Sequence, residues 1–282
     1  RAMEFVTVTR DAGLLTITID RPEGHNSLNR ALRLELRRAF EDAAEQCVVK
    51  HDADADADAD ATGTGATDAG PVRAVLLKGG KKVFCTGQDL KEHLVDMNEP
   101  SAMDKVDTEY NPMVAALAAI PVPVVAAING AAAGAGWSLA LNCDFRVAAR
   151  SASFKAAFPS IGLATDCGIS YLLPQLVGPA KALQLLFDDQ PISAESALEL
   201  GLVTQVADGD DADEAAEEFA RRLASGPTGS YREIKAIGKD AAAMLAVADL
   251  EGGAQKRLVN SVDHREAVEA FLNKRAPRFT GR

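Results

Sequence analysis

Two short apolar runs with a helical pattern between them set the strongest limit on how this chain folds. Residues 73–78 (Arg-Ala-Val-Leu-Leu-Lys) and 123–128 (Pro-Val-Val-Ala-Ala-Ile) are typical of strands buried on both faces, and residues 103–120 repeat apolar side chains at helical spacing. A strand, a helix and a second strand in succession predict a βαβ crossover. We therefore expect an α/β protein with a sheet covered on both faces, and a further short strand at 145–148.

The N-terminal part has two regular patterns. Residues 5–9 and 14–19 alternate apolar with polar residues on either side of a short turn, which predicts a β-hairpin. Residues 27–46 place apolar side chains on one helical face. We expect a long amphipathic helix here, with Ser27 or Asn26 as its N-cap.

Composition changes sharply at residues 51–70, which lack large apolar side chains, lysine and arginine. Such a segment buries too little apolar surface to order itself, so we expect a flexible, solvated insertion. An EF-hand calcium loop is the alternative, but counting from Asp52 its sixth position is Ala57 instead of Gly and its twelfth is Gly63 instead of Glu. The insertion holds the aspartates Asp52, Asp54, Asp56, Asp58, Asp60 and Asp68.

Length and charge narrow the classes of function. The 282 residues suffice for one large domain or a domain with an appendage, and we divide them into a core at 1–200 and a C-terminal helical region at 201–282. The net charge of −11 disfavours nucleic acid and an anionic membrane surface as partners. No apolar stretch approaches the roughly 20 residues of a membrane span, and no signal segment is evident, so we expect a cytoplasmic protein.

The cysteines and histidines are scattered. The sequence has four of each, with no CxxC pair and no matching histidine spacing. We therefore expect reduced, structural thiols and no metal site.

Three glycine-rich or unusually polar stretches, at 83–90, 128–139 and 156–170, are candidates for chemistry. In the first, a Gly-Gln-Asp turn exposes backbone N–H groups after a strand; in the second, small residues lead into a helix and allow a ligand to approach its N-terminus. Tight helix packing also selects such small residues. The second stretch does not match a dinucleotide-binding fingerprint, because the third glycine and the ribose-binding acid are absent.

The third stretch contains one carboxylate, Asp166, in an otherwise uncharged run from residue 156 to 180. Desolvation should raise the pKa of this isolated acid, which suits a proton carrier. Alternatively, Asp166 caps a helix that starts at Cys167, and both roles are compatible.

Taken together, these stretches resemble the crotonase (enoyl-CoA hydratase/isomerase) superfamily over nearly the whole chain outside the insertion. Within it, the sequence is most similar to the 1,2-epoxyphenylacetyl-CoA isomerases of phenylacetate degradation. The motifs that carry the resemblance are Phe84-Cys85-Thr86-Gly87-Gln88-Asp89-Leu90, Ile128-Asn129-Gly130-Ala131-Ala132-Ala133-Gly134-Ala135-Gly136, Gly162-Leu163-Ala164-Thr165-Asp166-Cys167-Gly168, Leu172-Leu173-Pro174 and the ending from Phe271 to Phe279.

The resemblance implies a crotonase-like spiral of ββα units with a C-terminal helical region that mediates trimerisation and closes the pocket. It implies an acyl-CoA thioester as substrate, no separate cofactor, and a homotrimer or a dimer of trimers. It also implies that the backbone N–H groups of Gln88 and Ala135 form an oxyanion hole for a thioester enolate, aided by the helix dipole.

One departure from the family pattern bears directly on the reaction. Where hydratases of this superfamily carry two glutamates, this sequence has Ser138 and Phe158, and neither can act as a carboxylate base. Asp166 stands where related isomerases carry a catalytic aspartate. The resemblance therefore implies an isomerase in which Asp166 moves a proton to shift a double bond or to open a ring epoxide.

Further residues fall at positions where the family binds CoA or the acyl group: Ser27, Leu28, Thr86, Gly87, Asp89, Leu90, Gly134, Gly136, Trp137, Phe158, Lys274 and Phe279. Trp137 either fills the core or narrows the acyl pocket. Lys274 either meets a phosphate or is a solvated helix end.

Three other functions remain open from the sequence, and the first is an enoyl-CoA hydratase-like activity, which the two missing glutamates disfavour. An aryl-CoA dehalogenase would use an aspartate near this position as a nucleophile instead of a base. A non-catalytic acyl-CoA-binding protein would explain the loss of both hydratase glutamates, although an acid retained in an uncharged pocket has no evident use there.

Overall fold

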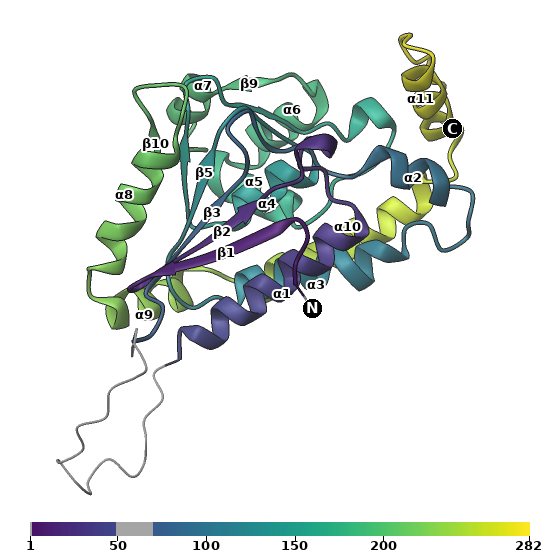
Figure 1. Ribbon diagram of the computed structural model, residues 1–282. Helices are drawn as coiled ribbons and strands as arrows, with labels where there is room; N and C mark the ends of the chain where they lie inside the picture. The colour runs from purple at the N-terminus through teal and green to yellow at the C-terminus, as the bar shows by residue number, and fades with distance from the viewer. Residues whose placement is uncertain (1, 49–69) are drawn as a thin grey trace, which may run out of the picture.

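The computed structural model describes residues 2–48 and 70–282, so the predicted insertion lies outside the described residues except for Gly70. Two sheets and surrounding helices make up this part of the chain (Figure 1). The larger sheet has the strand order β1-β2-β3-β5-β7-β10. Its strands are β1 (Val6–Asp11), β2 (Leu14–Ile19), β3 (Ala74–Lys78), β5 (Val124–Ile128), β7 (Phe145–Ala148) and β10 (Gln205–Val206).

The predicted strands are confirmed. β1 and β2 form the expected antiparallel hairpin, and β2, β3, β5 and β7 pair in parallel, as βαβ crossovers require. Alternate side chains of β3 belong to separate apolar clusters on the two faces of the sheet, so the sheet is covered on both sides as predicted.

A smaller sheet follows the order β4-β6-β8-β9. Its strands are β4 (Val83–Cys85), β6 (Ala131–Ala133), β8 (Ser153–Lys155) and β9 (Ile192–Ser193). The sequence patterns did not predict this sheet, because strands of two or three residues are too short to show a period. Two of its strands, β4 and β6, lie within the glycine-rich stretches 83–90 and 128–139.

Helices surround the sheets. They are α1 (Arg30–Gln46), α2 (Leu90–Asp96), α3 (Asn111–Ala118), α4 (Ala135–Asn142), α5 (Ile169–Val177), α6 (Pro179–Asp188), α7 (Ala194–Glu199), α8 (Asp213–Ala224), α9 (Thr228–Gly238), α10 (Ala241–Leu258) and α11 (Val262–Leu272), with short turns η1 (Pro22–Gly24), η2 (Val106–Tyr110) and η3 (Pro159–Ile161). In Figure 1, α8 runs along one side of the larger sheet while α1, α3 and α10 run along its other side.

The long amphipathic helix is confirmed, but its predicted cap is wrong. α1 begins at Arg30, and the side chain of Asn29 caps it by accepting a hydrogen bond from the Leu32 amide at 2.9 Å. Neither Ser27 nor Asn26 caps the helix: the Ser27 hydroxyl oxygen accepts from the Arg21 side chain, and the Asn26 side-chain oxygen accepts from the Arg21 amide.

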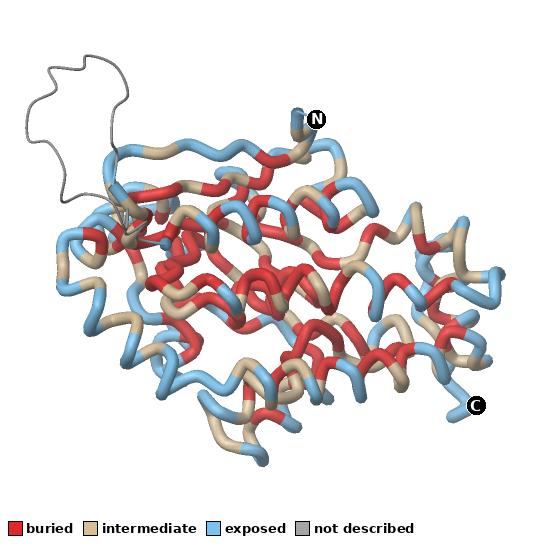
Figure 2. Tube along the Cα trace, turned by 90° about the horizontal axis from the view of Figure 1, so that it is seen from below, coloured by how far each residue is buried: buried red, intermediate tan, exposed pale blue. Residues whose placement is uncertain are grey.

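The helical pattern at 103–120 is confirmed over residues 104–118, where the π-helix η2 runs directly into α3. The boundary at residue 200 differs in detail from the packing. β10 pairs with β7, and the alanines of α8 pack on the larger sheet, so part of the region 201–282 completes the core. Buried residues form a continuous interior and exposed residues lie around it (Figure 2).

None of the helices in the described ranges is both long and apolar enough to cross a bilayer. The four cysteines are buried and unpaired, as predicted. Burial raises the pKa of the Cys85 and Cys143 thiols to about 12, so these thiols stay protonated and unreactive near neutral pH.

A buried arginine joins α1 to the elements that position α2. The Arg33 side chain, 2% exposed, forms ion pairs with Glu92 of α2 and Glu109 of η2 and stacks over the Tyr110 ring at 4.8 Å. We expect Arg33→Ala to lower the free energy of unfolding by about 3–5 kcal/mol, because both carboxylates lose their buried partner.

Urea denaturation measures this change. Arg37→Ala is the matched control on the same helix, because Arg37 pairs with Glu41 at 2.8 Å while 42% exposed, and we expect its loss to cost less than about 1 kcal/mol. Equal effects of the two substitutions would contradict the role of the Arg33 network.

Candidate active site

The loop after β4 meets the start of α4 at very short range. Gly87 has a φ of +90°, and a Cβ placed on it would lie 2.7 Å from the Ala133 carbonyl oxygen and 3.1 Å from the Ala135 nitrogen. Any side chain at this position would therefore collide with the main chain of the second stretch. The peptide that carries the Gln88 amide thus lies against the first turn of α4.

The backbone amides of Gln88 and Ala135 are both unused. Neither donates a hydrogen bond to a backbone or side-chain acceptor among the described residues. Ala135 is the first residue of α4, where amides have no intrahelical acceptor and the helix dipole is positive. The structure brings the Gly87–Gln88 segment against Ala135, and the role of the two amides as donors to an enolate stays a prediction.

Asp166 is buried beside the same helix turn. The residue is 8% exposed, and its Oδ1 accepts a hydrogen bond from the hydroxyl of Ser138 at 3.5 Å. Ser138 stands three residues after Ala135, so the acid lies next to the turn whose first amide faces Gly87. The structure therefore places Asp166, Ser138 and the two donor amides in one small region.

The environment of Asp166 favours its neutral form. Burial and, to a smaller extent, the carboxylate of Glu251 raise the pKa of Asp166 from 3.8 to about 8, while hydrogen bonds from Cys167 and Ser138 oppose the rise. The raised pKa predicted from the isolation of this acid in the sequence is confirmed. At neutral pH most molecules hold Asp166 protonated, with a minority poised as a base.

The alternative role of Asp166 as a helix cap is wrong. α5 begins at Ile169, its N-cap is Gly168 with a φ of +82°, and no side chain within its N-terminal segment caps it. Glu251 of α10 supplies the acceptor instead, taking hydrogen bonds from the Gly168 amide at 2.6 Å and the Ser170 amide at 3.1 Å.

Glu251 is the functional-site residue that sequence reasoning missed. It is 4% exposed, and burial raises its pKa. It lies 83 residues beyond Gly168, within a long helix, so no local pattern links it to the Asp166 stretch. A run with a single acid in the sequence is therefore paired with a second carboxylate in space.

Three other predicted residues adjoin the donor amides. A Cβ on Gly134 would lie 4.0 Å from the Cε1 atom of Phe158, so the Phe158 ring borders this turn. A side chain on Gly136 would collide with the carbonyl oxygen of Cys85, which explains the need for glycine there. Phe158 and Ser138 thus flank the site at the two positions where carboxylates are missing.

The predicted CoA-binding residues near the N-terminus also join this loop. The Leu28 amide donates to the Gly87 carbonyl at 2.7 Å, which holds the first helix against the donor loop. The side chains of Ser27 and Asp89 hydrogen bond to each other, and Asp89 also pairs with Arg21 at 2.7 Å. These groups therefore brace the loop through their own contacts.

Two neighbours of Asp89 complete that loop. The Thr86 hydroxyl donates to the His25 carbonyl at 3.2 Å, and Leu90 begins α2, which Asp89 caps through the Glu92 amide.

Of the last three predicted residues, Trp137 lies in the first turn of α4, and Lys274 and Phe279 follow α11. Trp137 is fully buried, packs against Phe154 with ring centroids 6.3 Å apart, and its indole nitrogen has no hydrogen-bond partner among the described residues. Lys274 and Phe279 are exposed on the segment after α11, which hydrogen bonds back to Asp263. Their proposed contacts with the nucleotide stay predictions.

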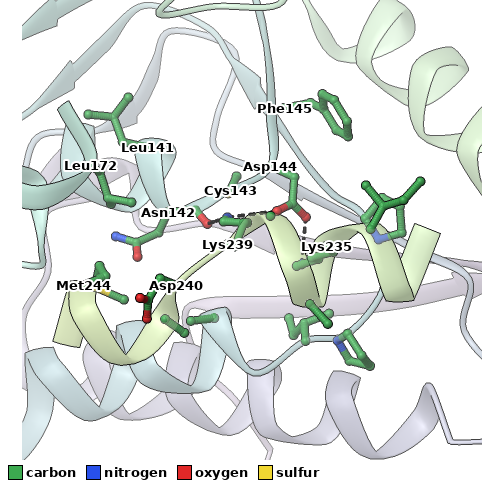
Figure 3. A pocket seen from close by; sticks show the side chains of 18 of the residues that line it. Leu141, Asn142, Cys143, Asp144, Phe145, Leu172, Lys235, Lys239, Asp240 and Met244 are labelled. Atoms are coloured by element: carbon green, nitrogen blue, oxygen red, sulfur yellow. Dashed lines mark hydrogen bonds and ion pairs between the residues drawn. The ribbon is translucent and has the colours of Figure 1, made fainter. Parts of the chain in front are cut away.

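A separate pocket of about 740 Å³ lies elsewhere on the molecule (Figure 3). None of the predicted site residues lines it, and its Asp144 accepts hydrogen bonds from both Lys235 at 2.7 Å and Lys239 at 2.9 Å. These ammonium groups outweigh burial and lower the pKa of Asp144. An acid held ionised in this way is a poor proton carrier, so we place the candidate active site at Asp166.

No cluster of three or more potential metal ligands occurs within residues 2–48 and 70–282. The absence of a separate cofactor, the trimeric assembly and the cytoplasmic location stay predictions.

Comparisons with known proteins agree with this fold. Residues 65–282 match the family model Enoyl-CoA hydratase/isomerase. The chain is 38% identical to 1,2-epoxyphenylacetyl-CoA isomerase of Escherichia coli (strain K12), covering 99% of this chain and 100% of the relative. It is 31% identical to trans-2-decenoyl-acyl-carrier-protein isomerase of Streptococcus mutans, covering 96% of each.

A solved enoyl-CoA hydratase from Mycobacterium avium subsp. paratuberculosis K-10 superposes with a TM-score of 0.79 at 31% identity, covering 99% of this chain and 100% of that chain. Together with the strand and helix order, this similarity defines a protein of the crotonase class. The chain belongs to the enoyl-CoA hydratase/isomerase family.

The raised pKa of Asp166 makes stability depend on pH. Between pH 3.8 and about 8, Asp166 holds a proton in the folded state that it has lost in the unfolded chain. The contribution of Asp166 to the free energy of unfolding therefore falls by about 1.4 kcal/mol for each pH unit across this interval. Asparagine does not titrate. We expect Asp166→Asn to be more stable than the unsubstituted protein at pH 8, and the gain to shrink steadily towards pH 5.

Chemical denaturation of both proteins at each pH measures this difference. The comparison at pH 5 is the reference for the change, because only the part of the interval between pH 3.8 and pH 5 still contributes to the difference there. A difference in stability that stays constant from pH 5 to pH 8 would show that Asp166 is not held neutral in the folded protein.

Proposed function

We propose that this protein is an acyl-CoA isomerase that uses Asp166 as its acid and base. The observation that carries the proposal is a buried carboxyl group with a pKa of about 8 beside two unused backbone amides. A general acid–base works best when its pKa lies near the working pH, because both protonation states are then accessible. The membership of the enoyl-CoA hydratase/isomerase family supports a CoA thioester as the substrate.

In the proposed reaction, ionised Asp166 removes a proton from the carbon next to the thioester carbonyl. The electrons of the broken C–H bond form an enolate, and its oxygen accepts hydrogen bonds from the Gln88 and Ala135 amides. Protonated Asp166 then delivers the same proton to the γ-carbon, which moves the double bond. Each such donor is worth on the order of 3 kcal/mol in the barrier.

The name of the Escherichia coli relative supports a ring epoxide as the particular substrate. The enolate oxygen would be held in the same way while the C–C bond shared by the epoxide and the six-membered ring breaks. Both C–O bonds remain, so the epoxide oxygen becomes a member of the expanded oxepin ring. The Phe158 ring beside Gly134 supplies an aromatic surface of the kind that a phenyl-derived acyl group contacts.

The site disfavours the two enzymatic alternatives. Hydration needs carboxylates at the positions of Ser138 and Phe158, and neither side chain ionises. A dehalogenase uses only the ionised form of its aspartate nucleophile, so a pKa raised to about 8 brings it no advantage. A proton carrier uses both states and is favoured by the same environment.

Asp166→Asn should abolish isomerisation and leave thioester binding nearly intact, because the amide keeps the volume but cannot move a proton. We expect a loss of at least about 10³-fold in kcat, measured by mass spectrometry of products from 3-enoyl-CoA and ring-epoxide CoA substrates. Calorimetric titration with the same thioesters measures binding.

The alternatives predict other results. A hydrated product would indicate a hydratase, and an acyl-enzyme ester trapped on Asp166 would indicate a dehalogenase. Unchanged substrate with tight binding by the unsubstituted protein would indicate a non-catalytic acyl-CoA-binding protein.

The contribution of Glu251 gives a separate test through the pH profile. Because the reaction starts with ionised Asp166, kcat/KM should rise with pH through a midpoint near the pKa of about 8. Glu251→Gln removes a negative charge that raises this pKa, so we expect its midpoint to lie at lower pH.

Steady-state kinetics between pH 6 and pH 9.5 measure the midpoint. Glu218→Gln, a substitution of an exposed acid on α8, is the control and should keep the midpoint of the unsubstituted protein. A midpoint that moves upward in Glu251→Gln would contradict the assignment.

A further inference from the structure

Two buried histidines join the C-terminal helix to the loop of the candidate active site. His93 of α2 and His264 of α11 are both fully buried, and their Nε2 atoms lie 2.8 Å apart. The Nδ1 atom of His93 lies 3.2 Å from the side-chain nitrogen of Gln88, and the Nδ1 atom of His264 lies 2.6 Å from the carbonyl oxygen of Ile161. The four groups form one continuous hydrogen-bonded chain.

The direction of this chain follows from its ends. The Ile161 carbonyl can only accept, so His264 carries its proton on Nδ1 and presents Nε2 as an acceptor. His93 must then donate from Nε2 and accept at Nδ1 from the Gln88 side-chain amide. All donors and acceptors are matched when both rings are neutral, and a proton added to either ring breaks the match.

The surroundings favour neutral rings. Burial lowers the pKa of His93 to about 4, with a further contribution from Lys105 and an opposing one from Asp96. Burial also lowers the pKa of His264, against the hydrogen bond to Ile161. The charge of Lys105 is itself shared with Asp96 at 3.4 Å and Glu92 at 3.9 Å.

Both ends of the chain reach segments of the candidate active site. Gln88 carries one of the two amides without an acceptor among the described residues, its side chain contacts His93, and the preceding Gly87 lies against Ala135. Ile161 and Gly162 lie in the segment between Phe158 and Asp166. A Cβ on Gly162 would lie 3.0 Å from the backbone of His264, which shows how closely α11 packs there.

We propose that His93 and His264 are positioning residues that hold the donor amide of Gln88 and the segment carrying Asp166 at a fixed separation. This inference rests on the proposed function of the site. The histidines touch neither substrate nor reacting atoms in it. They act through Gln88 and Ile161, and they make α11 part of the support of the site.

Paired substitutions at His264 test the role. His264→Phe keeps a ring of similar size but leaves the His93 Nε2–H without an acceptor, whereas His264→Gln places an amide oxygen close to the position of the lost Nε2 acceptor. We expect His264→Phe to lower kcat on the order of tenfold with KM within about twofold, and His264→Gln to recover most of the loss. His25→Asn, at an exposed histidine, is the control.

A variant at the other end guards against misfolding of His264→Phe. Gln88→Met removes the side-chain donor to His93 and keeps the backbone amide, so a similar fall in kcat is expected. Equal activity of His264→Phe, Gln88→Met and the unsubstituted protein would overturn the positioning role, as would an equal loss in His264→Phe and His264→Gln.

The ring protons give a test that does not depend on activity. Nitrogen-15 NMR of the unsubstituted protein at pH 7 should show two neutral rings, with the His264 proton on Nδ1 and the His93 proton on Nε2. A cationic ring or the opposite tautomers would overturn the inference. If the unsubstituted protein shows these tautomers but turns over no CoA substrate, the result counts against the proposed function. It also counts against a positioning role of the hydrogen-bonded histidines in catalysis.

Discussion

Two backbones approach each other without intervening side chains where the loop after β4 meets the first turn of α4. The approach requires glycine at 87, because a Cβ there would collide with Ala133 and Ala135. Within residues 2–48 and 70–282, the amides of Gln88 and Ala135 have no acceptor. Unpaired amides at a helix start attract negative charge. The other site residues are arranged around this contact between two main-chain segments.

Asp166 and Glu251 show that the site is built at a cost to stability. Two buried carboxyl groups lie near each other, and burial raises the pKa of both. Glu251 offsets part of its own desolvation by accepting two backbone amides, whereas Asp166 has only weak partners in Ser138 and Cys167. An acid with few strong hydrogen bonds remains free to exchange a proton with a bound molecule.

The predictability of each feature from sequence followed the range of the interaction that produces it. β3 and β5 were predicted because unbroken apolar runs report burial on both faces, and Asp166 was singled out because its neighbours in sequence are also neighbours in space. β4 and β6 are too short to show a period. Glu251 and His264 lie in helices whose local pattern says nothing about partners 83 and 171 residues away.

The placement of Glu251 on α10 and of His264 on α11 also sets the order in which the parts of the site are synthesised. Every strand of the two sheets precedes these helices in the chain, so the strands are made before the carboxylate that caps α5 and the imidazole that meets α2. At about 5–20 residues per second, several seconds of synthesis separate β10 from His264. The segments that carry Gln88 and Asp166 therefore reach their full set of contacts only after α10 and α11 have been added.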